Sequence, residues 1–172
     1  MGLGAPLQYI IQASWNYGSH RTISPSNLPQ DRYDFIASLP SGNQEALRRE
    51  IKKQFGLVGQ IEAIETNALL LEVKIPNAPG LVSSTKRSGG MQVWHGTFKC
   101  DGEPISILSG ILESIFGIPV VEHTNLKGNY DINIKWQENN LADLKQVLLN
   151  QLGLELVPTN MPIEMLVVEK VK

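Results

Sequence analysis

The chain has 172 residues, of which 42% are hydrophobic and 19% charged, and its formal net charge is −2. This composition is typical of a globular protein and excludes a disordered or fibrous one. Lys and Arg are spread along the chain, which argues against a nucleic-acid-binding surface, and no stretch is apolar for long enough to span a membrane. Cys100 is the single cysteine, which excludes an intrachain disulfide and a cysteine-based zinc site.

The start of the chain predicts a helix with no strand before it. Residues 1–6 lack the charged and apolar regions of a signal peptide, so none is expected here. Apolar residues at helical spacing predict a helix over Pro6–Tyr17, with Gly18 as its stop. Because only five residues precede Pro6, the strand that should lead into this helix is either truncated or leaves its sheet position unfilled.

A strand, a helix and a hairpin are predicted for the rest of the first half. The helix is the clearest element, because its apolar residues recur at every fourth position and a glycine follows it. The predicted elements are a strand at Tyr33–Leu39, the helix Asn43–Phe55 ending at Gly56, and a hairpin of Leu57–Ile64 and Ala68–Lys74 with a turn at Thr66-Asn67.

The middle of the chain is predicted as a linker followed by one strand. Residues 76–90 are rich in Pro, Gly and Ser and predict a flexible linker. Met91–Cys100 alternates enough to predict a single strand with Trp94 and Phe98 on the same face.

The second half repeats the pattern of the first. Its helices carry an apolar stripe and end at glycines, and its central strand alternates strictly between apolar and polar residues. The predicted elements are a helix at Ile105–Phe116, strands at Ile118–Glu122 and Tyr130–Trp136, a helix from the N-cap Asn140 (with Asp143 as its capping partner) to Gly153, and a hairpin of Leu154–Val157 and Glu164–Val171.

An internal repeat is the strongest signal in the sequence. Residues 33–74 align without a gap to residues 130–171, and nine of the 42 pairs are identical, where typical residue usage gives about two or three. The identical pairs are Tyr33/Tyr130, Asp34/Asp131, Asn43/Asn140, Leu47/Leu144, Gln54/Gln151, Gly56/Gly153, Leu57/Leu154, Leu69/Leu166 and Glu72/Glu169. The predicted fold is therefore α+β, with two tandem duplicated units, each with two helices packed on small mixed or antiparallel sheets. We expect the units at 1–75 and 91–172, joined by the linker 76–90.

No residue type clusters in a pattern that predicts catalysis. His20, His95 and His123 lie far apart in the sequence and form no helical pair of metal ligands, so neither a metal nor a cofactor is predicted. His95 and Cys100 are five positions apart on one predicted strand, hence on opposite faces, and a buried, inert Cys100 is expected. Ser88-Gly89-Gly90 follows Lys86-Arg87, the reverse of the order in a phosphate-binding loop.

The remaining candidates favour structural roles. Asp34 and Asp131 recur at equivalent positions on the polar faces of their strands, which favours a structural or exposed role over a pair of catalytic acids. Three tryptophans, Trp15, Trp94 and Trp136, are predicted in the core. Four basic residues on one helix, Arg48, Arg49, Lys52 and Lys53, predict a solvated face, with an acidic partner as the alternative.

Several segments resemble an uncharacterised family of soil bacteria, domain-of-unknown-function family 3738. The resemblance rests on Gly117–Trp136, Leu148–Pro158 and Pro162–Val168, and in the first half on Asp31–Ala37 and Glu45–Phe55. The start departs from the family, which normally has a strand before Leu7. More distantly, each half is similar to the short N-terminal domain of secretins and TonB-dependent receptors, on the Val120-Val121 strand, the Leu126-Lys127-Gly128 loop and the following helix.

These resemblances imply a non-catalytic interaction module. The secretin-type domains are periplasmic and bind proteins, and proteins of this kind carry export signals, which implies a periplasmic or secreted location; a cytoplasmic one stays open. We expect binding to a protein through a sheet edge or helix face, with a homodimer through an unfilled sheet edge as one form of it. The alternative is a small-ligand-binding protein or enzyme with its pocket between the two units.

Overall fold

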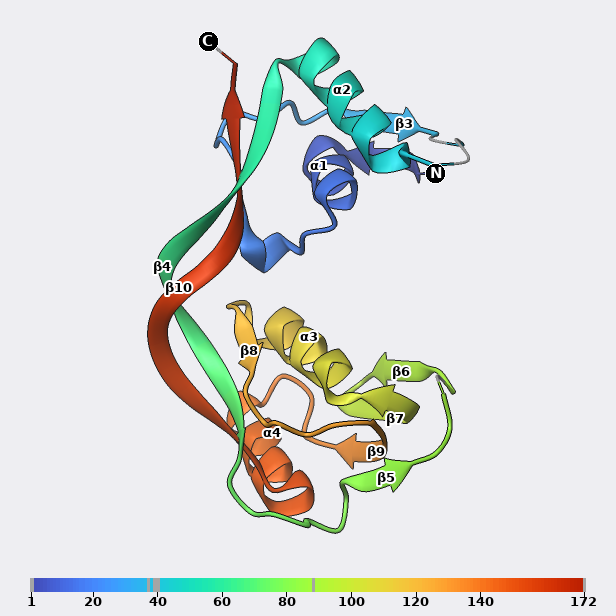
Figure 1. The fold of residues 1–172 in the computed structure, drawn as a ribbon, viewed down its shortest axis with the longest axis vertical. Helices are drawn as coiled ribbons and strands as arrows, with labels where there is room; N and C mark the ends of the chain where they lie inside the picture. Colours follow the sequence, from blue (N-terminus) through green and yellow to red (C-terminus); the bar gives the residue numbers. More distant parts are fainter. Residues whose placement is uncertain (1, 37, 39–40, 88, 172) are drawn as a thin grey trace. The chain divides into compact units, whose positions relative to one another are not determined.

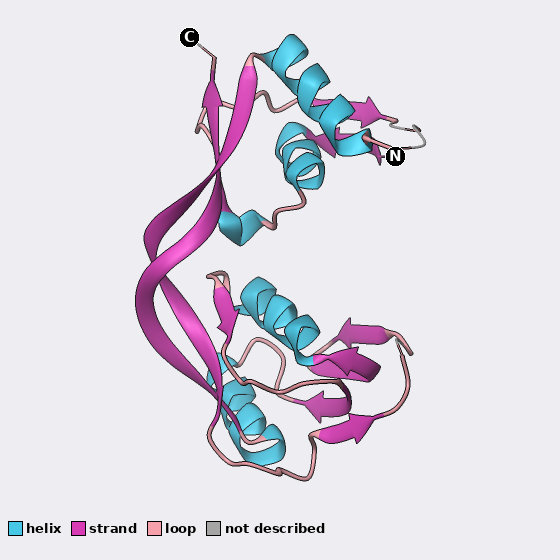
Figure 2. Ribbon diagram, in the orientation of Figure 1, coloured by secondary structure: helices cyan, strands magenta, loops and turns pink. Residues whose placement is uncertain are grey.

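The computed structural model describes residues 2–36, 38, 41–87 and 89–171. Within these residues the fold is mixed α+β, with four α-helices and ten strands in three sheets (Figures 1 and 2). None of the helices found there is long and apolar enough to cross a membrane. The chain packs as two compact units: unit 1 is Met1–Thr66 with Pro162–Lys172, and unit 2 is Asn67–Met161.

Unit 1 contains two helices and a two-stranded sheet. Its elements are β1 (Gly2–Pro6), α1 (Leu7–Trp15), the 3₁₀ helix η1 (Ser19–Arg21), β2 (Thr22–Ile23), β3 (Arg32–Phe35) and α2 (Asn43–Phe55). Strands β1 and β3 pair in antiparallel fashion. The apolar stripe of α1, with Leu7 and Ile11 fully buried, packs with Ile51 of α2 in the core of this unit.

The prediction that no strand precedes the first helix is wrong. Strand β1 fills this position, and Ala5 and Pro6 lie opposite Tyr33 and Arg32 of β3. Pro6 has extended backbone angles, φ −64° and ψ 148°, and serves as the N-cap of α1. The few residues before Pro6 are enough for a strand because β3 provides backbone partners for them. The sheet position that was predicted to be unfilled is therefore occupied by β1. The prediction of a homodimer through this edge no longer has an observation to support it.

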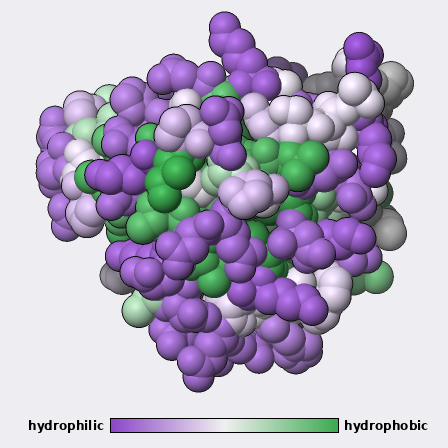
Figure 3. Space-filling view, turned by 90° about the horizontal axis from the view of Figure 1, so that it is seen from below, coloured by the Kyte–Doolittle hydropathy of each residue, from purple (hydrophilic) through white to green (hydrophobic). Residues whose placement is uncertain are grey.

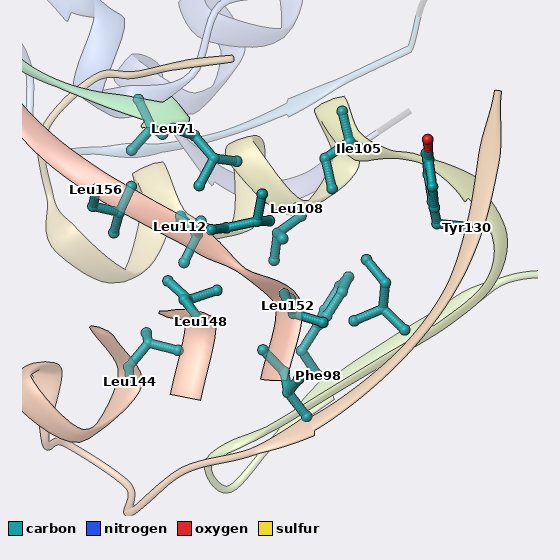
Figure 4. Packing of buried hydrophobic residues seen from close by; sticks show 14 of the residues in the cluster. Leu71, Phe98, Ile105, Leu108, Leu112, Tyr130, Leu144, Leu148, Leu152 and Leu156 are labelled. Carbon is teal, nitrogen blue, oxygen red and sulfur yellow. The ribbon is translucent and has the colours of Figure 1, made fainter. Parts of the chain in front are cut away.

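Unit 2 has a four-stranded antiparallel sheet beside two helices. Its elements are β5 (Val82–Ser84), β6 (Met91–Trp94), β7 (Thr97–Pro104), α3 (Ile105–Phe116), β8 (Val120–Glu122), β9 (Asn129–Lys135), α4 (Leu141–Val147) and the π-helical turn η2 (Leu148–Leu152). The order in the sheet is β5-β9-β7-β6. Figure 4 shows the core, in which Leu108 and Leu112 of α3 face Leu148 and Phe98.

Two long strands replace the two hairpins predicted from the sequence. Strands β4 (Leu57–Val73) and β10 (Leu154–Lys170) are continuous and lie side by side (Figure 1). The turn predicted at Thr66-Asn67 instead faces β10, where the Asn160 side chain donates a hydrogen bond to that of Asn67 at 3.2 Å. Each strand satisfies the backbone groups of the other, so the local turn signals do not bend the chain.

The long strands exchange their ends between the units. Leu69 and Leu71 of β4 are buried in the core of unit 2, whereas Leu166 and Val168 of β10 are buried in the core of unit 1. These residues align in the sequence repeat, so each half of the chain completes the core of the other. The predicted repeat units at 1–75 and 91–172 therefore differ from the compact units, and they stay a prediction about sequence similarity.

The structure also revises the middle of the chain. Met91–Cys100 is not one strand, because β6 and β7 form a hairpin with His95 and Gly96 in its turn, both at positive φ. Strand β5 lies within the predicted linker and pairs with β9. The helices Asn43–Phe55 and Ile105–Phe116 are confirmed residue for residue.

Candidate functional site

The β6 edge of the sheet in unit 2 carries exposed apolar side chains. Met91, Val93 and Trp94 are 49%, 44% and 48% exposed, and no further strand of the described chain pairs with β6. Val93 lies opposite Phe98, and Met91 lies opposite Cys100. Directly opposed residues share a face of the sheet, so the apolar face that is buried on β7 continues to the surface on β6.

A pocket of about 420 Å³ lies beside this strand. Its apolar lining comes from β6, from α3, and from the end of β9 and the start of α4. We name the strand and the pocket together the β6 groove, defined by Met91, Val93, Trp94, Ile115, Trp136 and Leu141. The volume and apolar lining suit the side chain of a large hydrophobic residue.

The hairpin turn holds the polar rim of the β6 groove in place. The backbone N–H of Trp136 donates to the Gly96 carbonyl at 2.7 Å. His95 Nδ1 lies 3.4 Å from Glu138 Oε2, and both side chains are exposed. Both residues line the pocket, so this contact provides polar groups at its rim.

Exposed hydrophobic side chains outside the β6 groove include Leu3, Tyr9 and Ile36. Figure 3 shows one face of the protein, on which green hydrophobic areas lie between purple hydrophilic side chains. Scattered exposure of this kind is normal for a folded protein, whereas the β6 groove joins exposed side chains to an open sheet edge.

His95 and Cys100, the histidine and cysteine considered together in the sequence, have different surroundings in the structure. His95 lies in the hairpin turn and Cys100 is buried on β7, where its Sγ donates to the Tyr130 carbonyl at 3.8 Å. Cys100 is 2% exposed, which confirms the expected buried position. This burial raises the pKa of the Cys100 thiol and so keeps it protonated at neutral pH.

The other histidines lie in separate surroundings. His20 is part of η1, and His123 Nδ1 lies 3.0 Å from Glu72 Oε1. Among the described residues, no three His, Cys, Asp or Glu side chains meet in a way that could hold a metal ion. Of the predicted Lys86–Gly90 loop, Ser88 lies outside the described residues.

The two recurring aspartates have the same structural contact. The N–H of Gly4 donates to Asp34 Oδ1 at 2.7 Å, and the N–H of Gly102 donates to Asp131 Oδ1 at 2.7 Å. Each glycine lies where the register of its strand pair shifts. A hydrogen bond from the Ser84 side chain, the Gly102 N–H and nearby Lys86 lower the pKa of Asp131.

The tryptophans divide into two kinds. Trp15 and Trp136 are partly buried and pack against the cores of their units, as predicted. The prediction for Trp94 is wrong, because the turn at His95-Gly96 places Trp94 opposite Thr97 at the edge of the sheet. The missed signal is the two-residue turn itself, since a glycine between two alternating runs is typical of a hairpin.

Part of the basic helix face has a packing role. The Arg48 guanidinium lies 5.1 Å from the centre of the Trp15 ring, and Arg48 Nε donates to the Ser14 carbonyl at 2.9 Å. Lys53 pairs with Glu50 at 3.7 Å on the exposed side of the helix.

Comparison with known proteins gives one result. The family model described as "Protein of unknown function (DUF3738)" matches residues 8–171. No curated protein and no solved structure matches the chain.

Proposed function

Since the chain belongs to the DUF3738 family of proteins of unknown function, we propose its function from the geometry: a non-catalytic module that binds an extended segment of another protein at the β6 groove. The observation that carries this proposal is an open sheet edge with apolar side chains beside a pocket. Edge strands are templates for strand addition, and side-chain pockets beside them provide specificity.

The hydrogen-bonding pattern of the hairpin supports strand addition. The N–H of Asp101 donates to the Gly90 carbonyl, and the N–H of Gly89 donates to the Asp101 carbonyl. Trp94 and Thr97 flank the two-residue turn, a position that belongs to a hydrogen-bonded pair of the hairpin. Because hydrogen-bonded and non-hydrogen-bonded pairs alternate in an antiparallel ladder, Met91 and Val93 direct their N–H and C=O groups away from β7. These groups are the ones that an added strand would pair with.

The pocket favours a ligand with a large apolar residue. Trp136, Ile115 and Leu141 provide an apolar lining, and His95 and Glu138 provide polar groups at the rim. The expected ligand is thus an extended segment that alternates apolar residues and places one aromatic or leucine side chain in the pocket.

An internal duplication is part of the same proposal. The order strand, helix, short strand, strand, helix and long strand occurs in β1–β4 and again in β7–β10. The contacts Gly4–Asp34 and Gly102–Asp131, together with the N-caps Pro6 and Pro104, support descent from one ancestral unit. The similarity to secretin-type domains and the periplasmic or secreted location stay predictions, as does the alternative of a ligand pocket between the repeat units.

A selection of short random peptides against the full chain tests the function. Selected peptides should share an extended apolar pattern and should change the tryptophan fluorescence, because Trp94 and Trp136 line the pocket. Val93→Pro removes an outward N–H and should weaken their binding by about tenfold or more, whereas the control Val93→Thr keeps this N–H and should weaken it less. If no peptide is selected, or if Val93→Pro binds the selected peptides as well as the native chain, the proposal is wrong.

A further inference from the structure

In unit 2, the chain itself covers the edge of β9 that lies away from β7. Strand β5 pairs with β9, with Val82 opposite Asp131 and Ser84 opposite Asn129. Just before β5, the Gly80 N–H donates to the Gln151 carbonyl at 2.9 Å, and Leu81 packs against the core. Residues 78–84, a turn closed by a hydrogen bond from the Leu81 N–H to the Ala78 carbonyl and then strand β5, therefore cover β9 and the turn η2.

The corresponding surface of unit 1 has no such cover among the described residues. Strand β3 aligns with β9 in the sequence repeat, but its sheet consists of β1 and β3 alone. A pocket of about 320 Å³ lies between β3 and α2. We name it the α2 groove, and its apolar lining includes Tyr33, Phe35, Leu47, Ile51 and Phe55.

From this comparison we propose that the α2 groove binds a segment of another protein that pairs with β3 as β5 pairs with β9, with side chains like those of residues 78–86. The register of β5 on β9, moved to unit 1, places the added strand opposite Arg32, Tyr33 and Asp34 of β3. This site is separate from the β6 groove and does not depend on the function proposed for it.

The contacts of the cover in unit 2 define the chemistry of the partner segment. Leu81 contributes a large apolar side chain to the core of unit 2, so the partner should place a similar one in the α2 groove. The Ser84 side chain hydrogen-bonds to Asp131, and Lys86 Nζ lies 3.9 Å from Asp131 Oδ2. Asp34 occupies the aligned position and lines the α2 groove with Glu50, which favours a segment with a hydroxyl and a basic residue after its apolar part.

A foreign segment is favoured over a second copy of this chain. The copy would have to release its own residues 78–84, which pair with β9 and include the buried Ala78. That release costs the copy part of its own core, whereas a segment of another protein has no such contacts to lose.

The test uses a labelled peptide with the sequence of residues 78–86 and the full chain. We expect saturable binding by fluorescence anisotropy and changes in the amide NMR signals of β3 and α2. Leu47→Glu puts a charge into the α2 groove, and a peptide carrying Leu81→Asp loses its apolar side chain; each should weaken binding by about tenfold or more. Trp94→Ala is the matched control in the β6 groove and should leave binding unchanged.

A second variant tests the same site in case Leu47→Glu does not fold. Glu50 is exposed on α2, so Glu50→Lys should leave the fold intact and weaken binding of the basic peptide. The proposal is overturned by a lack of saturable binding, by equal binding of the Leu81→Asp peptide, or by NMR changes confined to β9. It is also overturned if light scattering shows a dimer of the native chain that Leu47→Glu abolishes, because the occupant is then a second copy.

Discussion

Asp34 and Asp131, at aligned positions of the repeat, show that an acid which recurs within a sequence can have a structural role as a hydrogen-bond acceptor for the backbone. Both accept a hydrogen bond from a glycine N–H where the strand pair loses its regular register. A carboxylate in this place satisfies a donor that the ladder leaves without a partner. An acid that is repeated within a sequence can therefore be needed for the fold as readily as for catalysis.

The lowered pKa of Asp131 predicts a pH-dependent contribution to stability. A carboxyl group with a lower pKa in the folded state stabilises the fold above its unfolded pKa of about 4, and this contribution is lost as the pH falls through the folded value. We expect Asp131→Asn to lower the free energy of unfolding at pH 7 and the difference from the native chain to shrink below about pH 4. Urea unfolding at several pH values measures this difference.

Glu164→Gln, at an exposed position of β10, controls for the loss of one negative charge. It should show a smaller difference at pH 7 than Asp131→Asn. A difference for Asp131→Asn that stays constant to pH 3 would contradict the electrostatic cause and point to altered packing.

Single residues were predictable where their surroundings are local. Asn140 caps α4 as expected, because its Oδ1 accepts from the Asp143 N–H at 3.0 Å, three residues away. Trp94 was not predictable from its hydrophobicity, since its exposure depends on a turn that reverses the strand direction. The β6 groove was therefore missed at the residue scale, although the idea of binding at a sheet edge came from the sequence.

At the scale of elements, helices were easier to predict than strands. The bounds of α2 and α3 follow from an apolar stripe and a terminal glycine, and both signals lie within the helix. The bounds of β4 and β10 depend on each other instead. Pro158 and Pro162 are usual turn residues, but within the described chain β10 pairs with β2 only at Leu166 and Val167, so the edge of β10 away from β4 is open at the two prolines. A Pro whose missing N–H faces an open edge removes no hydrogen bond of the sheet.

The helix-ending glycines 56 and 153 should respond differently to the same substitution. Both have positive φ, 63° and 67°, so an alanine costs about 1–2 kcal/mol at either position from backbone conformation alone. A Cβ at Gly153 would lie 2.0 Å from the Ile75 carbonyl oxygen, whereas a Cβ at Gly56 would meet nothing within 4 Å. We expect Gly153→Ala to lower the free energy of unfolding by clearly more than Gly56→Ala, as measured by urea titration; equal losses would contradict the close approach.

For the whole molecule, the exchange of strand ends is the main feature that the sequence did not predict. The repeat correctly aligns Leu69 with Leu166, and both residues are buried. Sequence similarity, however, does not say which copy of a strand completes which core, because both copies offer the same apolar pattern. Only the pairing of β4 with β10 along their length assigns Leu166 to unit 1 and Leu69 to unit 2.

This assignment predicts crossed effects of two equivalent substitutions. Leu166→Ala and Leu69→Ala should each destabilise the protein by about 2–5 kcal/mol, because each leaves a cavity in a core. Hydrogen exchange should quicken in α1 and α2 for Leu166→Ala, and in α3 for Leu69→Ala. If each substitution instead affects the helices of its own half of the sequence, the chain has the hairpin arrangement and the strands are not exchanged.

The path of β10 also affects how the chain folds during its synthesis. The core of unit 1 includes Leu166 and Val168, which are translated long after α1 and α2. Helices α1 and α2 emerge from the ribosome long before these side chains and must wait for them with an apolar face uncovered. Folding of unit 1 therefore depends on the later synthesis of β10, so a nascent chain arrested before β10 should be a better substrate for chaperones and proteases than its length alone would suggest.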